Sequence, residues 1–130
     1  MEVNGIPGDL IKQATEIHHF FDSFTDGDHV SAETLIDDVE NRDRQCWIIR
    51  DEKIRAMALT RIAAGEYPIC EITHVSGEGL KEWHSAFLTI EEWARALGCK
   101  RIRALARPGY ERIGARYGLR KTHVLLEVNL

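Results

Sequence analysis

Two arginines near the end of the chain are spaced so that they could bind an anion together. Arg112 and Arg116 are four residues apart, so they share one face of any helix that contains both, and Arg107 precedes them. Guanidinium groups bind phosphate oxygens through paired hydrogen bonds. These arginines are therefore candidates for holding a phosphate group, and the alternative is ordinary solvation on a surface helix.

The cysteines and histidines offer less chemistry. Cys70 could be a nucleophile, but no base is identifiable beside it, and the alternative is a small buried hydrophobic residue. It is widely separated from Cys46 and Cys99, without the paired spacing of a disulfide scaffold or a zinc site. The pair His18-His19 also lacks partners at metal spacing. We expect no metal, and a reducing, cytoplasmic compartment.

Length, composition and charge are those of one globular domain spanning residues 1–130. The chain is 44% hydrophobic and 29% charged, and no apolar run is long enough to span a bilayer or to form an export signal. The net charge of −4 divides into −11 for residues 1–94 and +7 for residues 95–130. The basic part could contact phosphate, nucleic acid or an acidic partner, or it could neutralise the acidic part of the same fold.

Hydrophobic periodicity predicts alternating helices and strands without a domain boundary or an internal repeat. Ser31 is suited to cap a short helix that buries Leu35, Ile36 and Val39. Glycines suit the ends of two later helices, at Gly98 and Gly118. The predicted elements are a helix over 10–21, a helix after 31, a hairpin of 46–50 with 54–62, a strand over 69–75, a helix over 80–97, a strand over 101–106, a short helix over 110–117 and a final strand over 124–128.

The segment from residue 69 to residue 106 reads as strand, helix, strand. Such a crossover joins two parallel strands and is right-handed in nearly all proteins. Because the hairpin before it is antiparallel, the sheet should be mixed. The sequence therefore predicts a single-domain α/β fold with a mixed central sheet flanked by helices.

This order of elements resembles the GCN5-related N-acetyltransferase (GNAT) family over most of the chain. The best local matches are residues 93–102, similar to the family's passage from a long helix into a strand, and residues 112–119, similar to its final helix ending at a glycine. Small divergent members of the family occur in bacteriophages, and this chain resembles that type. The resemblance implies a GNAT-like fold and acetyl-CoA as the cofactor.

The family binds the cofactor pyrophosphate with a loop of the form Arg/Gln-x-x-Gly-x-Gly/Ala. The matching segment is 74–79, with both glycines present, His74 at the Arg/Gln position and the acidic Glu78 where phosphate should approach. The alternative is that the glycines only form a tight turn between strand and helix. The cofactor-binding residues that the resemblance implies are Val75, Ser76, Gly77, Gly79, Leu80, Arg112 and Arg116.

Direct acetyl transfer needs a base for the acceptor amine and an acid for the leaving thiolate. The family commonly uses a strand carboxylate and a tyrosine on the last helix. By this resemblance Glu71 is the best candidate base and His74 the alternative, although Glu71 could instead pair with an arginine. The tyrosine position falls on Gly114, and of the two flanking tyrosines, Tyr110 and Tyr117, we favour Tyr117 as the acid.

Two functions follow from these patterns. The first is acyl-CoA-dependent N-acyl transfer with a degenerate site, to a small amine or a protein amine. The acidic first 94 residues favour a cationic acceptor by electrostatic steering. The second is a non-catalytic binding or assembly protein with the same fold. Nucleic-acid binding ranks below both, because the helix around Arg112 is short and the net charge is negative. The oligomeric state is left open.

Overall fold

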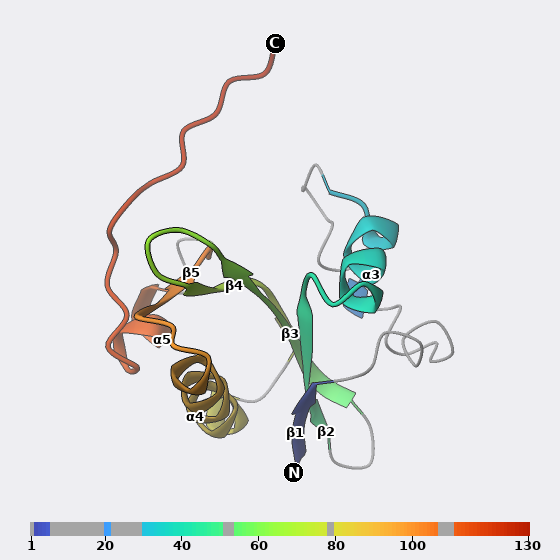
Figure 1. The fold of residues 1–130 in the computed structure, drawn as a ribbon, viewed down its shortest axis with the longest axis vertical. Helices are drawn as coiled ribbons and strands as arrows, with labels where there is room; N and C mark the ends of the chain where they lie inside the picture. Colours follow the sequence, from blue (N-terminus) through green and yellow to red (C-terminus); the bar gives the residue numbers. More distant parts are fainter. Residues whose placement is uncertain (1, 6–19, 22–29, 51–53, 78–79, 107–110) are drawn as a thin grey trace.

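The computed structural model describes residues 2–5, 20–21, 30–50, 54–77, 80–106 and 111–130 (Figure 1). Within these ranges one sheet of five strands has the order β1-β2-β3-β4-β5. The elements are β1 (Glu2–Gly5), α3 (Ala32–Glu40), β2 (Gln45–Arg50), β3 (Ile54–Ala63), β4 (Ile69–Gly77), α4 (Leu80–Ala96), β5 (Arg101–Ala104) and α5 (Glu111–Ala115).

The sheet is mixed, as the sequence predicts. The first four strands pair antiparallel in chain order. The last strand, β5, runs parallel to β4, from the pair Ile69 and Arg101 to the pair Ile72 and Ala104. Helix α4 makes the crossover between them, so the predicted strand-helix-strand unit is confirmed.

The sheet separates two hydrophobic layers, with α3 on one face and α4 on the other (Figure 1). Alternate residues of β2 and β3 supply the two layers because successive strand side chains point to opposite faces. The α3 layer contains Phe21, Leu35, Ile36, Val39, Cys46, Ile48, Met57 and Leu59. The α4 layer contains Trp47, Ala58, Cys70, Ile90 and Ala94, with Trp83, Trp93 and Ile102 packed against it.

Local signals in the sequence set the helix ends. The backbone N–H of Thr34 donates to Oγ of Ser31 at 3.2 Å, which confirms the predicted cap of α3. Gly98 after α4 and Gly118 after α5 have φ of +84° and +78°, the left-handed conformation that glycine adopts without strain. Trp47 and Trp93 pack edge to face with ring centroids 5.2 Å apart, as expected of core residues.

Three expectations differ from the structure. The predicted strand over 124–128 is wrong: these residues form neither helix nor strand and are exposed, and none of the described strands pairs with them. Strand β1 was not predicted, because a short terminal strand gives little periodicity. The predicted helix over 10–21 lies outside the described residues except for Phe20 and Phe21, which are helical, and Phe21 is fully buried.

Candidate functional site

An irregularity in β4 lies at the centre of the candidate site. Leu59 of β3 pairs with His74, but the next residue, Thr60, pairs with Ile72. Thr73 is therefore an extra residue on β4 without a counterpart on β3, which defines a β-bulge. Bulges redirect side chains and occur often beside functional sites.

The bulge brings two candidate side chains to one face of the sheet. Without it, Glu71 and His74 would point to opposite faces, because they are an odd number of residues apart. With it, Glu71 pairs opposite Arg61 and His74 opposite Leu59, and these two β3 residues share a face. Leu59 belongs to the α3 layer, so Glu71 and His74 both lie on the α3 side.

Thr73 connects His74 to a buried arginine. Nδ1 of His74 lies 2.9 Å from Oγ1 of Thr73. The same oxygen accepts a hydrogen bond of 2.8 Å from Nη1 of Arg44 and donates a longer one of 3.4 Å to the carbonyl oxygen of Leu59. Arg44 is only 9% exposed, and its Nε donates to Oδ2 of Asp38 at 2.9 Å. The chain of contacts thus runs from α3 through Arg44 and Thr73 to His74.

Glu71 is engaged in an ion pair. Nε of Arg61 donates to Oε1 of Glu71 at 3.0 Å, and the arginine side chain is 44% exposed while the glutamate is 14% exposed. The alternative that Glu71 pairs with an arginine is therefore realised in the structure. To act as a base, this carboxylate would first have to release Arg61, and at such exposure an ion pair costs little to open.

One edge of β4 lacks a strand partner beyond the bulge. The pairing with β5 ends at Ile72 and Ala104, followed by one hydrogen bond from the N–H of Leu105 to the carbonyl of Ile72 at 3.1 Å. Strand β4 continues to Gly77. Among the described residues, segment 73–77 therefore has β3 on one side and no strand on the other. On that side no described strand pairs with this segment.

The end of β4 is fixed by a close approach to β3. Gly77 has φ of +128°, and a Cβ atom added there would lie 2.4 Å from both Cα of Ala56 and the carbonyl oxygen of Arg55. Glycine is thus required at this position by packing, whether or not a ligand binds. Of the other implied cofactor residues, Val75 is exposed, Ser76 is half-buried and α4 begins at Leu80. Glu78 and Gly79 lie outside the described residues.

Tyr117 lies on the side of α4. Its ring stacks on Phe87 with centroids 4.8 Å apart and on His84 at 5.7 Å, both of which belong to α4. The structure therefore places Tyr117 on the opposite side of the sheet from Glu71 and His74. A base on the α3 face and an acid on the α4 side could reach the same reacting group only beyond the end of β5, because no described strand pairs with β4 there.

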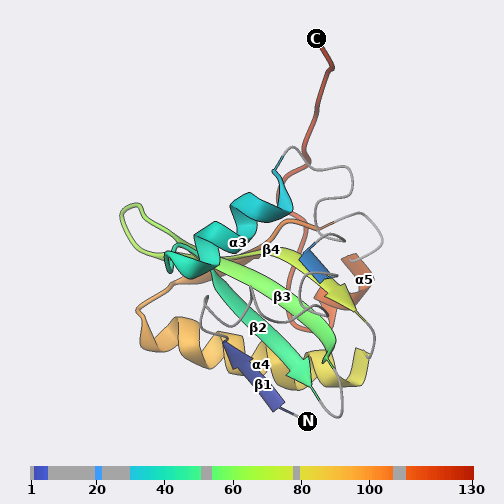
Figure 2. The ribbon, with the colours of Figure 1, turned by 90° about the vertical axis from the view of Figure 1, so that its right-hand side faces the viewer.

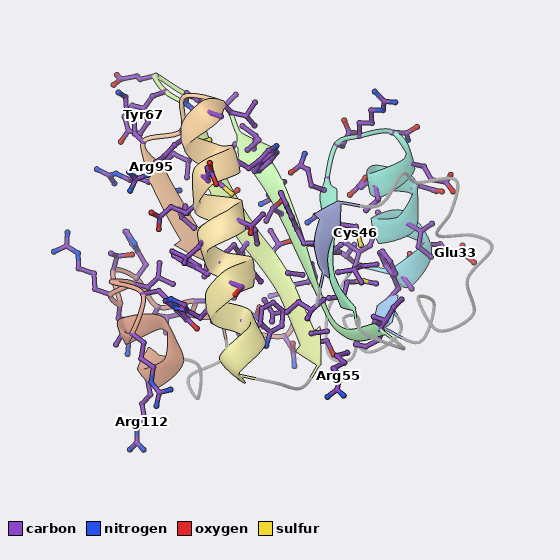
Figure 3. The ribbon with its side chains drawn as sticks, turned by 90° about the horizontal axis from the view of Figure 1, so that it is seen from below. Glu33, Cys46, Arg55, Tyr67, Arg95 and Arg112 are labelled. Carbon is purple, nitrogen blue, oxygen red and sulfur yellow. The ribbon has the colours of Figure 1, made fainter. Side chains whose placement is uncertain are left out.

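Gly114, where the resemblance predicts the family's tyrosine position, is covered by another side chain. A Cβ atom there would lie 3.3 Å from Cβ of Leu119. Arg112 and Arg116 are exposed. Figure 3 shows the Arg112 side chain extending away from α4 and the sheet, so in this structure the two arginines are surface cations at the end of the molecule that carries α5.

The buried thiols are unsuited to nucleophilic chemistry. Burial raises the pKa of Cys46 to about 12 and that of Cys70 to about 12. A thiolate is the reactive form, so at neutral pH both remain inert thiols. Figure 3 shows Cys46 between β2 and α3. For Cys70 the alternative of a small buried hydrophobic residue is confirmed, since it is fully buried in the α4 layer.

Sequence reasoning missed Arg44 and Thr73. A bulge leaves no periodic signal, so the position that holds His74 was not identifiable from the strand pattern, and Arg44 lies 29 residues before its partner Thr73. Within the described part of the chain, no cluster of three or more metal-binding side chains occurs. The helices described there are too short or too polar to cross a membrane.

The fold defined above is that of the GNAT acetyltransferases. No protein-family model and no curated protein matches the sequence. Solved structures do match, at identities low enough that the likeness establishes the fold alone. The resemblance predicted from the order of elements is thereby confirmed at the level of the fold.

Three of these structures illustrate the likeness. A glucosamine-6-phosphate N-acetyltransferase from Arabidopsis thaliana has a TM-score of 0.74 at 11% identity, covering 98% of this chain and 97% of that one. A predicted acetyltransferase from Clostridium acetobutylicum, solved with acetyl-CoA, has a TM-score of 0.72 at 14% identity, covering 98% and 95%. An aminoglycoside acetyltransferase from an uncultured soil metagenomic sample, in complex with sisomicin, has a TM-score of 0.70 at 11% identity, covering 99% and 95%.

Proposed function

We propose that this chain is an acyl-CoA-dependent N-acyltransferase that transfers an acetyl group to an amine. The observation that carries the proposal is the open edge of β4 over 73–77, close to the start of α4. An extended ligand can add to the edge of a sheet through its amides, and a helix N-terminus favours anions. Coenzyme A has both amides and a pyrophosphate, so it fits this arrangement.

Each part of the chain has a role in this proposal. When bound, acetyl-CoA supplies the acetyl group as a thioester. The open edge of β4 binds its amides, and the start of α4 with the turn before it binds its pyrophosphate. Arg112 of α5 and Arg116 just after it are exposed, and they would contribute positive charge once their side chains turn toward the phosphates. The cofactor-binding residues proposed are Val75, Ser76, Gly77, Gly79, Leu80, Arg112 and Arg116.

The α3 face supplies the base and the α4 side supplies the acid. His74 or Glu71 accepts the proton of the acceptor amine, and the Tyr117 hydroxyl donates a proton to the leaving thiolate. The ion pair between Arg61 and Glu71 weighs against Glu71 as the base, because the carboxylate would first have to release Arg61. A base and an acid on opposite faces of the sheet suit this chemistry, because the amine and the thiolate lie on different sides of the reacting carbon.

The acceptor is an amine, and we propose a cationic one. Its approach is favoured by the acidic first 94 residues, with a net charge of −11. Two neighbours in fold are named for amine-bearing sugars: one for glucosamine 6-phosphate and one for aminoglycosides. We propose an amino sugar without a phosphate group, or a protein amine, for this chain, and a cytoplasmic location.

A non-catalytic binding or assembly protein is the second candidate. Specific observations favour it: Glu71 is ion-paired, Gly114 stands where the family has a tyrosine, and Gly77 is explained by packing against Ala56 alone. In that case the open edge of β4 would have no cofactor to bind.

Calorimetric titration with acetyl-CoA separates the two candidates. Binding is expected, weakened about 2- to 20-fold by the double substitution Arg112→Ala with Arg116→Ala. The matched control removes the same charge from exposed residues further along, Arg120→Ala with Lys121→Ala, and should bind as the wild type does. Glu78→Gln should strengthen binding about fivefold by removing a negative charge near the phosphates. No binding by any of these proteins would leave the non-catalytic protein as the surviving account.

A further inference from the structure

The hydroxyl oxygen of Thr73 lies within hydrogen-bond distance of three polar atoms. Nη1 of Arg44 is 2.8 Å away, Nδ1 of His74 is 2.9 Å away and the carbonyl oxygen of Leu59 is 3.4 Å away. All three contacts are part-buried. A hydroxyl group has one proton to donate and two lone pairs to accept with, so it can bond three partners only when two of them donate to it.

Two of the three partners have a fixed role, and together they determine the role of the third. A guanidinium nitrogen can only donate and a carbonyl oxygen can only accept. When Thr73 donates to Leu59 and accepts from Arg44, one lone pair remains for His74. All three contacts are therefore hydrogen bonds only when Nδ1 of His74 carries a proton. In the opposite arrangement Thr73 donates to Nδ1, and its oxygen faces the carbonyl oxygen of Leu59 with no proton between them.

Arg44 holds the hydroxyl from a position that is itself fixed. Its side chain is 9% exposed, and its Nε donates to Oδ2 of Asp38 at 2.9 Å. Its backbone N–H also donates to the carbonyl oxygen of Asp38, at 3.2 Å. Asp38 belongs to α3, and Figure 2, which views the sheet from the α3 side, shows this helix crossing in front of β3 and β4. Because the guanidinium is planar and anchored at Nε, Nη1 stays directed at one lone pair of Thr73.

We propose that Arg44 and Thr73 are positioning residues that hold neutral His74 with its proton on Nδ1 and its lone pair on Nε2. In a neutral imidazole one ring nitrogen donates and the other accepts, so the hydrogen bond at Nδ1 sets the state of Nε2. Nε2 is then the atom that takes the proton of the acceptor amine. That last step rests on the proposed function, whereas the position of the ring proton does not.

The chain contains a second pair of neighbouring threonine and histidine that serves as an internal reference. Nδ1 of His123 lies 2.9 Å from Oγ1 of Thr122, the same distance as in the pair of Thr73 and His74. Thr122 and His123 are both exposed, so water competes for each of their hydrogen-bonding groups. Contact with a neighbouring threonine does not fix a tautomer under these conditions. His123 should therefore show a mixture of both tautomers.

The test is the position of the ring proton, observed in long-range ¹H–¹⁵N NMR spectra of the full chain. The spectra are recorded above the pH at which the histidine signals stop titrating, and His74→Ala assigns the signals of His74 by removing them. The proton of His74 should lie predominantly on Nδ1. The wild-type spectrum alone can overturn the proposal, because a proton on Nε2 would mean that Thr73 donates to the ring. The mixture expected of His123 would mean that nothing fixes the ring of His74.

Four variants assign the roles of the two positioning residues. Thr73→Val removes the hydroxyl, so the proton should move largely to Nε2, whereas Thr73→Ser keeps the hydroxyl and should keep the proton on Nδ1. Arg44→Met removes the donor, so the freed hydroxyl should donate to Nδ1 and the ring proton should again move to Nε2. Thr122→Val makes the same chemical change at the exposed pair and should leave the His74 signals unchanged. A tautomer unchanged in both Thr73→Val and Arg44→Met would overturn the proposal, and the two Thr73 variants decide it if Arg44→Met does not fold.

Kinetics distinguish a positioning role from a merely structural one. In the transfer assay, Thr73→Val should lower kcat about 10- to 100-fold more than Thr73→Ser, below the full contribution of a general base, and should change KM for acetyl-CoA less than about twofold. In the background of His74→Ala, Thr73→Val should lower kcat no further, because the threonine acts only through the histidine. An equal loss in both backgrounds would overturn the positioning role.

Failure of this proposal and failure of the proposed function give different results. A proton on Nδ1 of His74 in a protein that transfers no acetyl group would support the positioning of the ring and contradict the proposed function. Transfer by a protein whose His74 proton lies on Nε2 would support the function and overturn the positioning.

Discussion

Thr73 and His74 are neighbours on one strand, yet their side chains meet, with Oγ1 2.9 Å from Nδ1. A regular strand would send them to opposite faces. The bulge at Thr73 removes that separation and places the imidazole beside a hydroxyl that is itself held by Arg44. The position of the candidate base therefore depends on a threonine that contributes no proton transfer of its own.

Thr73→Val should destabilise the protein more than Thr73→Ser. Valine has nearly the same shape but leaves Nη1 of Arg44 without its acceptor in a part-buried site, which should cost about 1.5–3 kcal/mol. Serine keeps the hydroxyl and loses one methyl group, worth about 0.8 kcal/mol. Urea unfolding of the two variants and the wild type measures both losses of stability. If valine and serine cost the same, the contact with Arg44 contributes nothing.

Gly77→Ala should be among the most destabilising single changes in the chain. The added Cβ atom would lie 2.4 Å from the β3 backbone at Ala56, so the strands must shift. We expect a loss of about 3 kcal/mol, from overpacking and from the positive φ together. Gly98→Ala is the matched control: φ is also positive, at +84°, but no atom lies within 4 Å. It should lose only about 1–2 kcal/mol. Thermal or urea unfolding that ranks the two equally would contradict the close approach.

Sequence predicts the elements of this fold better than its site. The strand-helix-strand order, the Ser31 cap and the glycine stops are written in local patterns, and each is found. The bulge at Thr73 could not be predicted from a local pattern, because it depends on how β4 pairs with β3 rather than on the composition of either strand. The predicted strand over 124–128 shows the opposite failure: its alternation is typical of a strand, but a strand also needs a neighbour, and periodicity does not show whether one is present.

Stability should fall above pH 9, in part because of Cys46. Its thiol is buried, and its pKa is raised from 9.0 in the unfolded chain to about 12 in the fold. Below pH 9 the thiol is neutral in both states, so its contribution to stability is fully present. Between pH 9 and 12 only the unfolded chain loses the proton, so the free energy of unfolding falls by up to about 1.4 kcal/mol per pH unit.

The measurement for Cys46 is the free energy of unfolding in urea at pH 8, 9, 10 and 10.5. Other groups also titrate in this range, so the wild type is compared with Cys46→Ala. The variant will be less stable at pH 8 because it leaves a small cavity. The free energy of unfolding of Cys46→Ala should nevertheless decline less steeply with pH than that of the wild type. Parallel curves would mean that the thiol ionises equally in both states.

The last prediction concerns acetyl transfer itself. The resemblance predicts that Gly114 replaces the family's tyrosine, in which case water or a tyrosine from another turn must protonate the thiolate. Tyr117, stacked on Phe87, is the candidate on the α4 side. Coenzyme A is a fairly good leaving group, so a poorly placed acid should slow the reaction without abolishing it. We expect slow release of free thiol from acetyl-CoA with small cationic amines.

Four variants assign the roles in that assay. His74→Ala should lower kcat about 10²- to 10⁴-fold, the usual contribution of a general base, and Glu71→Gln should lower it less because Arg61 already occupies that carboxylate. Tyr117→Phe keeps the stacked ring and removes only the hydroxyl, so a fall of about 10²-fold would identify it as the acid. Tyr110→Phe is its control and should change kcat less than twofold, roughly the scatter expected without a proton-transfer role. Fast turnover that collapses with Tyr110→Phe would instead shift the acid to the start of the last helix. Transfer unaffected by His74→Ala and Glu71→Gln alike would remove the α3 face from the mechanism.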